Sequence, residues 1–98
     1  MIVSLMIVDD EEGVRRSLRK VLAQDGYDIL LAENGRQALQ MVQQNRDHLE
    51  TVISDFRMPG MDGLETLIEV GKINPEITRI MLTGYATMES AIESVNAG

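Results

Sequence analysis

Short apolar runs alternate with segments of helical periodicity, and this alternation constrains the fold more than any other feature. Residues 3–8 are apolar apart from Ser4, as is typical of a strand buried on both faces of a sheet. Apolar residues then recur at the spacing of one helix face: Val14, Leu18, Val21 and Leu22. Gly26 is suited to end this helix. The first unit is therefore predicted to be a strand followed by a helix.

The same pairing recurs along the rest of the chain. Strands are predicted over residues 27–32, 51–54 and 79–83. Helical spacing follows each strand: Ala38, Leu39 and Val42; Leu64, Leu67 and Ile68; Met88, Ala91, Ile92 and Val95. Asn34 is expected to cap the second helix, and Asn74-Pro75 to end the third. Four such units in 98 residues predict one α/β domain, a doubly wound parallel sheet with helices on both faces.

Composition excludes several classes of function. Sixteen acidic residues against nine basic ones give a net charge of −7, so direct binding of nucleic acid by this segment is not expected. The absence of cysteine excludes disulfides and thiolate metal sites and fits a cytoplasmic location. The apolar start, MIVSLMIV, lacks a basic leader and is too short to span a bilayer, so we expect no membrane association.

Polar residues follow three of the predicted strands. Asp9 and Asp10 follow the first strand, Asp55 the third, and Thr83 ends the fourth. Sites in such sheets form beyond the carboxyl ends of the strands, so three carboxylates converge if the first and third strands are neighbours. Their mutual repulsion would be relieved by a hard divalent cation, and oxygen ligands suit Mg²⁺. The simpler alternative is that these acids are solvated caps.

Three motifs at these strand ends make a family resemblance visible. They are VDDEE, SDFRMPGMDG and LTGYA. In this order they closely resemble the receiver domain of bacterial two-component response regulators, in the subset with glycine after the threonine. The resemblance covers the whole chain and implies a flavodoxin-like fold with strand order 2-1-3-4-5.

The resemblance also implies a role for each site residue. Asp55 would be the phosphoacceptor. Asp10 and Asp55 would ligate Mg²⁺ directly, together with the backbone carbonyl of Arg57, while Asp9 would hold the ion through water. Thr83 would place its hydroxyl on a phosphoryl oxygen.

Receivers in this family continue into a fifth strand, with a lysine at its end, and a fifth helix, whereas this chain stops after the predicted fourth helix. Its only lysines are Lys20 and Lys72, and neither lies at a predicted strand end. We therefore expect residues 1–98 to form a receiver domain incomplete at its C-terminus, with strand order 2-1-3-4. Three explanations for the missing strand and helix are considered. The chain is a fragment of a longer protein, or a partner or swapped segment completes the fold, or the chain is a stable truncated form.

The expected function is a phosphoacceptor switch rather than an enzyme. A sensor histidine kinase would supply the phosphoryl group, an output domain or protein partner would read it, and the domain could dimerise. The alternative is an interaction module that does not depend on phosphorylation. A phosphohydrolase of the haloacid-dehalogenase type is a third hypothesis, but it needs a second aspartate where this chain has Arg57.

Other features receive simpler interpretations. The resemblance implies that Arg57 and Tyr85 flank the route of attacking water, and we hypothesise that both side chains slow loss of the phosphoryl group. The alternative is that both simply point into solvent. His48 has no nucleophile or metal partner nearby in sequence, so no catalytic role is expected. A basic cluster on the first helix is interpreted as a solvated face, with an acidic partner as the alternative: Arg15, Arg16, Arg19 and Lys20.

Overall fold

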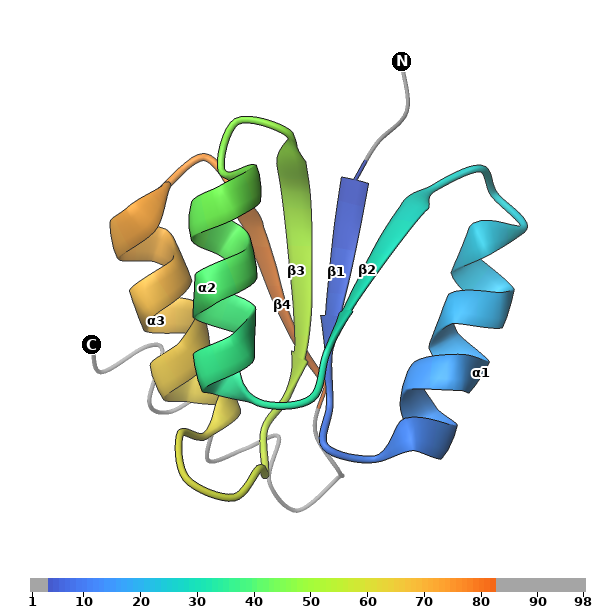
Figure 1. Ribbon diagram of the computed structural model, residues 1–98, viewed down its shortest axis with the longest axis horizontal. Coiled ribbons are helices and arrows are strands. Elements are labelled where there is room, and N and C mark those ends of the chain that lie inside the picture. Colours follow the sequence, from blue (N-terminus) through green and yellow to red (C-terminus); the bar gives the residue numbers. More distant parts are fainter. Residues whose placement is uncertain (1–3, 83–98) are drawn as a thin grey trace.

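The computed structural model describes residues 4–82, which alternate between strand and helix along the chain (Figure 1). The elements are β1 (Ser4–Val8), α1 (Glu12–Ala23), β2 (Asp28–Ala32), α2 (Gly35–Asn45), β3 (Leu49–Asp55), α3 (Gly63–Ile73) and β4 (Thr78–Leu82). The predicted fourth helix lies outside the described residues. None of the helices within the described range has the length and apolar character needed to cross a membrane.

The sheet is parallel and has the order β2-β1-β3-β4, which confirms the predicted topology. β1 is central and pairs with both β2 and β3, so that Val8 lies opposite Ser54 at the carboxyl end. The third strand begins at Leu49, two residues before the predicted start. Leu49 is buried, and the register between β1 and β3 shifts by one residue next to it. Glu50 interrupts the apolar run, which hid this extension in the sequence.

The main hydrophobic cluster lies on one face of the sheet, although Leu5 and Ile7 of β1 are buried as well. Helices α2 and α3 cover this face, and α1 lies on the other (Figure 1). The buried side chains of the core come from the strands, the two helices and the connecting loops: Met6, Val8, Ala32, Ala38, Val42, Leu49, Val52, Met58, Leu67, Val70 and Ile77. The two helices also pack on each other. Gly35 at the start of α2 lies so close to Thr66 of α3 and to Met61 that an added Cβ atom would overlap them.

Side-chain caps define where α2 and α3 begin. Asn34 accepts a hydrogen bond from the backbone N–H of Gln37 at 2.8 Å, which confirms the predicted cap of α2. Asp62 accepts one from the backbone N–H of Glu65 at 2.8 Å and caps α3 in the same way. α3 ends at Ile73 with Asn74 as its C-cap, next to the Asn74-Pro75 pair that was predicted to end it. α1 begins after Glu11 without a side-chain cap.

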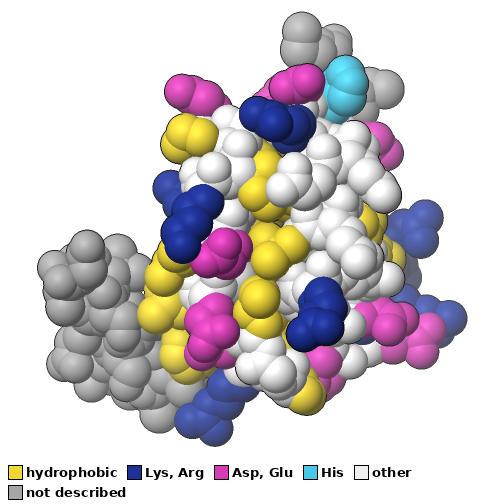
Figure 2. Space-filling view, turned by 60° about the vertical axis from the view of Figure 1, so that its left-hand side comes forward, with side chains coloured by type: hydrophobic (Ala, Val, Ile, Leu, Met, Phe, Trp, Pro, Cys, Tyr) yellow, Lys and Arg dark blue, Asp and Glu magenta, His cyan; other side chains and the backbone are white. Residues whose placement is uncertain are grey.

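Among residues 4–82, the face that carries α1 is more loosely covered. No residue of α1 is buried, and Val21, predicted to belong to its apolar face, is 60% exposed. That prediction was wrong because Val21 lies at the margin of the face, whereas Leu18 and Leu22 are half-buried. Ile80 and Leu82 of β4 are also exposed. On the side with α2 and α3, Figure 2 shows apolar side chains interrupted by charged ones rather than one broad apolar patch.

Candidate functional site

Three carboxylates meet at the carboxyl edge of the sheet. Asp9, Asp10 and Asp55 each offer an oxygen atom, and these atoms all lie within 4.8 Å of one another. They meet because β1 and β3 are parallel neighbours and end side by side. This confirms the convergence expected from the sequence.

Asp9 is the inner member of the group. Its side chain is buried, and its carboxylate accepts a hydrogen bond from the backbone N–H of Glu11 at 2.9 Å. Its own backbone N–H donates to the carbonyl of Ala32 at 3.1 Å, which ties the residue to the end of β2. Asp10 is exposed, so one side of the carboxylate group is buried and the other is open to solvent.

Asp55 is half-buried at the end of β3, and its environment disfavours its charge. Burial raises the pKa of the Asp55 carboxyl above its ordinary value of 3.8, and the negative charges of Asp9, Asp10 and Glu11 raise it further. The nearby backbone N–H of Phe56 acts in the opposite direction and lowers the pKa of Asp55. A bound cation would reverse the unfavourable balance by compensating the three acids.

The loop after Asp55 is closed by backbone hydrogen bonds at its base. Phe56 donates its N–H to the carbonyl of Leu82 at 3.1 Å and accepts from the N–H of Gly63 at 2.8 Å. A Cβ atom on Gly63 would overlap the Asp55 carbonyl group, lying 2.9 Å from its carbon. Gly60 has a φ of +80°, which favours glycine because side chains rarely adopt that conformation. These two glycines of the PGMDG motif therefore set the path of the loop.

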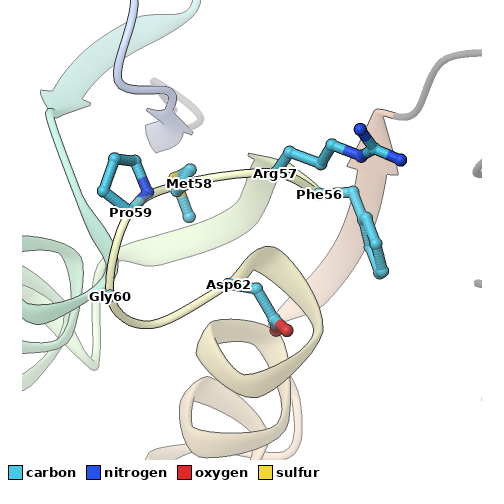
Figure 3. Close-up of a pocket in the computed structure, with 6 residues that line it drawn as sticks. All are labelled: Phe56, Arg57, Met58, Pro59, Gly60 and Asp62. Atoms are coloured by element: carbon cyan, nitrogen blue, oxygen red, sulfur yellow. The ribbon is translucent and has the colours of Figure 1, made fainter.

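Two open hollows lie beside this loop. Figure 3 shows the first, of about 450 Å³, lined by Phe56, Arg57, Met58, Pro59, Gly60 and Asp62. The chain bends at Pro59 and Gly60 and returns to Asp62 at the start of α3, while the Arg57 side chain extends away from the bend (Figure 3). The second hollow, of about 370 Å³, is lined in part by Asp10 and Glu33 and shares Pro59 and Gly60 with the first. Space for a small ligand is therefore available next to the acids.

The other predicted site residues have different outcomes. Arg57 is exposed in this loop, and the role of its backbone carbonyl stays a prediction. Thr83 and Tyr85 lie outside the described residues. His48 is exposed where α2 leads into β3, at the end of the sheet opposite Asp55, and the expectation that it has no catalytic role stays a prediction.

One contact at the site was missed by sequence reasoning. Arg15 was interpreted as part of a solvated basic face, but its side chain is only 12% exposed, and its guanidinium donates to the backbone carbonyl of Asp9 at 2.7 Å. The prediction was wrong for this residue. Arg15 directly follows Val14 of the half-buried helix face, and that adjacency was the available signal.

The arrangement can be compared with known proteins at this point. The sequence matches the family described as the response regulator receiver domain over residues 5–98. The chain belongs to this family. The assignment makes it a regulatory domain of two-component signal transduction, and it argues against a phosphohydrolase of the haloacid-dehalogenase type.

Individual relatives agree with this assignment. The receiver domain is 35% identical over 96 residues to the transcriptional regulatory protein ZraR of Escherichia coli (strain K12), covering 98% of this chain and 21% of ZraR. It is 38% identical over 94 residues to sporulation initiation phosphotransferase F of Bacillus subtilis (strain 168), covering 96% of this chain and 74% of that protein. The chain thus spans about a fifth of the length of ZraR but most of the phosphotransferase.

A solved structure agrees as well. A response regulator receiver domain protein from Clostridium thermocellum superimposes with a TM-score of 0.91 at 29% identity, covering 99% of this chain and 77% of that one. The flavodoxin-like receiver fold expected from the sequence is therefore confirmed.

Proposed function

We propose that this receiver domain is a phosphoacceptor switch that takes a phosphoryl group onto Asp55 in a Mg²⁺-dependent reaction. A sensor histidine kinase is the proposed donor, and an output domain or a protein partner is the proposed reader. The observation that carries the proposal is the meeting of Asp9, Asp10 and Asp55 within 4.8 Å at the end of the sheet.

The donor set fits Mg²⁺. All three side chains offer carboxylate oxygens, the ligands that this hard cation prefers, and the exposed Asp10 leaves room for the waters that Mg²⁺ retains. Asp10 and Asp55 would hold the ion directly, with the Arg57 backbone carbonyl as a third protein ligand. The buried Asp9 would act through a water molecule.

The residues of the chain then divide the work of phosphoryl transfer. A carboxylate oxygen of Asp55 attacks the phosphorus atom, the bond from phosphorus to the donor histidine nitrogen breaks, and its electron pair stays on that nitrogen. An acyl phosphate on Asp55 results. When bound, Mg²⁺ supplies neutralisation of the charge on the phosphoryl oxygens. Thr83 is proposed to donate its hydroxyl to one of these oxygens.

The product creates a new charge that a switch can read. A phosphoryl group adds roughly −1.5 to −2 charges near neutral pH, so a hydroxyl that moves to meet it biases a two-state element. Gly84 is the residue on which we propose membership of the TG subset, and it would leave room beside the group. Arg57 and Tyr85 are proposed to slow its hydrolysis, and unchanged acyl-phosphate lifetimes in both Arg57→Ala and Tyr85→Ala would contradict this role.

The charge and surface of the chain suggest how the signal leaves the domain. The net charge of −7 disfavours direct contact with nucleic acid, so we propose a protein or an attached output domain as the reader. A cytoplasmic location and dimerisation are part of the same proposal.

An assay with acetyl phosphate tests the phosphoacceptor function directly. The protein is incubated with acetyl phosphate and Mg²⁺, and its intact mass is measured beside samples with EDTA and with Asp55→Asn. We expect a gain of one phosphoryl group in the wild type only, and only with the metal. A gain that persists in Asp55→Asn would move the acceptor elsewhere.

A second candidate function is an interaction module that does not use phosphorylation. Of the two lysines in residues 1–98, Lys20 lies in α1 and Lys72 lies in α3, where it pairs with Glu69 at 3.0 Å. Neither can reach a phosphoryl group at the carboxyl end of the sheet from there. No mass gain in the wild type or in a longer natural form of the protein would support this module.

A further inference from the structure

Arg15 stands apart from the other basic side chains of α1. Its Nη1 donates to the backbone carbonyl oxygen of Asp9 at 2.7 Å, and its Nη2 lies 3.9 Å from Oε1 of Glu33. Its side chain is 12% exposed, whereas that of its neighbour Arg16 is 78% exposed and pairs with Glu12 within the same helix. Arg15 is therefore held at the margin of the acidic group, whereas the neighbouring Arg16, which has the same charge, does not contact that group.

The carbonyl that Arg15 contacts belongs to the peptide bond between Asp9 and Asp10. The orientation of this peptide determines where both carboxylates point, since it is the planar link between their Cα atoms. The Asp9 N–H is fixed to Ala32, and the Asp9 carboxylate accepts from the N–H of Glu11. Arg15 supplies the anchor on the remaining backbone polar atom of the residue, its carbonyl oxygen.

We propose that Arg15 is a positioning residue for the cation site, acting through the peptide that joins Asp9 to Asp10. The inference rests on the proposed function, because it concerns the site at which Mg²⁺ would bind. Arg15 bonds a main-chain carbonyl and leaves the carboxylate oxygens of Asp9 and Asp10 available to a cation. Glu33 faces the guanidinium from the β2–α2 turn and offsets part of its charge.

Positioning and charge predict opposite results when Arg15 is replaced. A nearby positive charge repels a divalent cation, so a purely electrostatic Arg15 would weaken Mg²⁺ binding, and its removal would strengthen it. A positioning Arg15 would strengthen Mg²⁺ binding, and its removal would weaken it. The sign of the change in affinity therefore decides between the two roles.

Titration calorimetry with Mg²⁺ alone provides the test, using the wild type, Arg15→Met, Arg15→Lys and Arg16→Met. We expect Arg15→Met to bind Mg²⁺ about tenfold more weakly, on the scale of one lost charge-assisted hydrogen bond. Arg15→Lys should recover part of the loss, because its ammonium can donate to the same carbonyl. Arg16→Met removes the same charge from the same helix and should bind as tightly as the wild type or slightly more tightly.

Two further measurements separate positioning from a loss of folding. Far-UV circular dichroism and urea unfolding without Mg²⁺ establish that each variant is folded at the titration temperature. In the metal-free protein, the amide NMR resonances of Asp10 and Glu11 should shift more in Arg15→Met than in Arg16→Met. If Arg15→Met does not fold, the test uses Arg15→Lys instead. Its affinity for Mg²⁺ and the same two amide resonances are then compared with those of the wild type.

The possible failures can be told apart. Mg²⁺ binding by Arg15→Met as tight as in the wild type, or tighter, would overturn the positioning role while leaving the proposed function intact. An equal loss of affinity in Arg16→Met would also overturn it, since the loss would then not depend on the hydrogen bond from Arg15 to the Asp9 carbonyl. If the wild type itself binds no Mg²⁺, the proposed function fails first.

Discussion

The two faces of the sheet differ in how they are held. Helices α2 and α3 bury Val42, Leu67 and Val70 against one face, while α1 has no buried residue on the other. Burial of apolar area is the main favourable contribution to folding, so most of the stability of the described residues is expected on the side of α2 and α3. The acidic site lies at the edge that both faces share.

The comparison also shows two ways of attaching a helix. α2 and α3 interlock with the sheet through fully buried side chains and begin at side-chain caps. α1 adds to its half-buried apolar side chains a polar link, from Arg15 to the end of β1. Changes in α2 and α3 should therefore act mainly on stability, and changes at Arg15 mainly on the site.

The largest expected effect comes from truncating equal leucines on the two faces. Leu67→Ala removes a buried side chain of α3 and should reduce the free energy of unfolding by about 2–5 kcal/mol. Leu18→Ala in α1 removes a half-buried one and should cost only about 1 kcal/mol. Urea unfolding monitored by circular dichroism measures both, and equal losses would break the comparison.

Glycine-to-alanine changes should have opposite signs on the two faces. A Cβ atom on Gly35 would crowd Thr66 and lie 2.9 Å from the sulfur of Met61, so Gly35→Ala should cost about 1–3 kcal/mol. Gly13 of α1 has nothing within 4 Å of a new Cβ atom, so Gly13→Ala should stabilise by about 0.5 kcal/mol through helix propensity. Thermal unfolding of the two variants checks the sign of each change in stability. A destabilised Gly13→Ala would show that other residues pack closely against α1 at this position.

Replacement of the N-cap residue by alanine should also distinguish α2 from α1. Asn34→Ala deletes the cap of α2 and should cost about 1 kcal/mol. Glu11→Ala at the corresponding position of α1 removes no side-chain cap and should change the free energy of unfolding by less than about 0.5 kcal/mol. Denaturant midpoints at constant slope are the measurement, with wild type in the same buffer as reference.

The smallest effect is expected at the shared edge, where solvent screens the half-exposed Asp55. The pKa of Asp55 is raised in the folded protein by burial and then by the neighbouring acids, so the folded state keeps a proton that the unfolded state has released. In the absence of Mg²⁺, the wild type should therefore become less stable relative to Asp55→Asn as the pH rises. This loss of stability begins near the ordinary pKa of 3.8 and is complete above the raised pKa of Asp55 in the folded protein.

Urea unfolding of the wild type and Asp55→Asn at several pH values, each with EDTA, measures this difference. It should be smallest at the acid end, where Asp55 is protonated in both states, and should reach a plateau above the raised pKa. A difference that shrinks as the pH rises would contradict the stated direction of the shift.

Much of the fold was predictable because its signals are local. The strand and helix periods, the Asn34 cap and the end of α3 just before Asn74-Pro75 all follow from short-range spacing and backbone chemistry. The start of β3 was less accessible, since Glu50 interrupts the apolar pattern although Leu49 beside it is buried.

The sequence by itself determined the order of elements and the three acids at strand ends, because both are written in local patterns of residue type. Only the tertiary structure decided that Val21 faces solvent and that Arg15 turns inward to the carbonyl of Asp9. Both outcomes depend on how α1 is rotated against β1 and β2, and helical periodicity specifies a face only to within about one residue on either side. A side chain at that margin is assigned to solvent or to the interior by the partners that the rest of the fold brings to it.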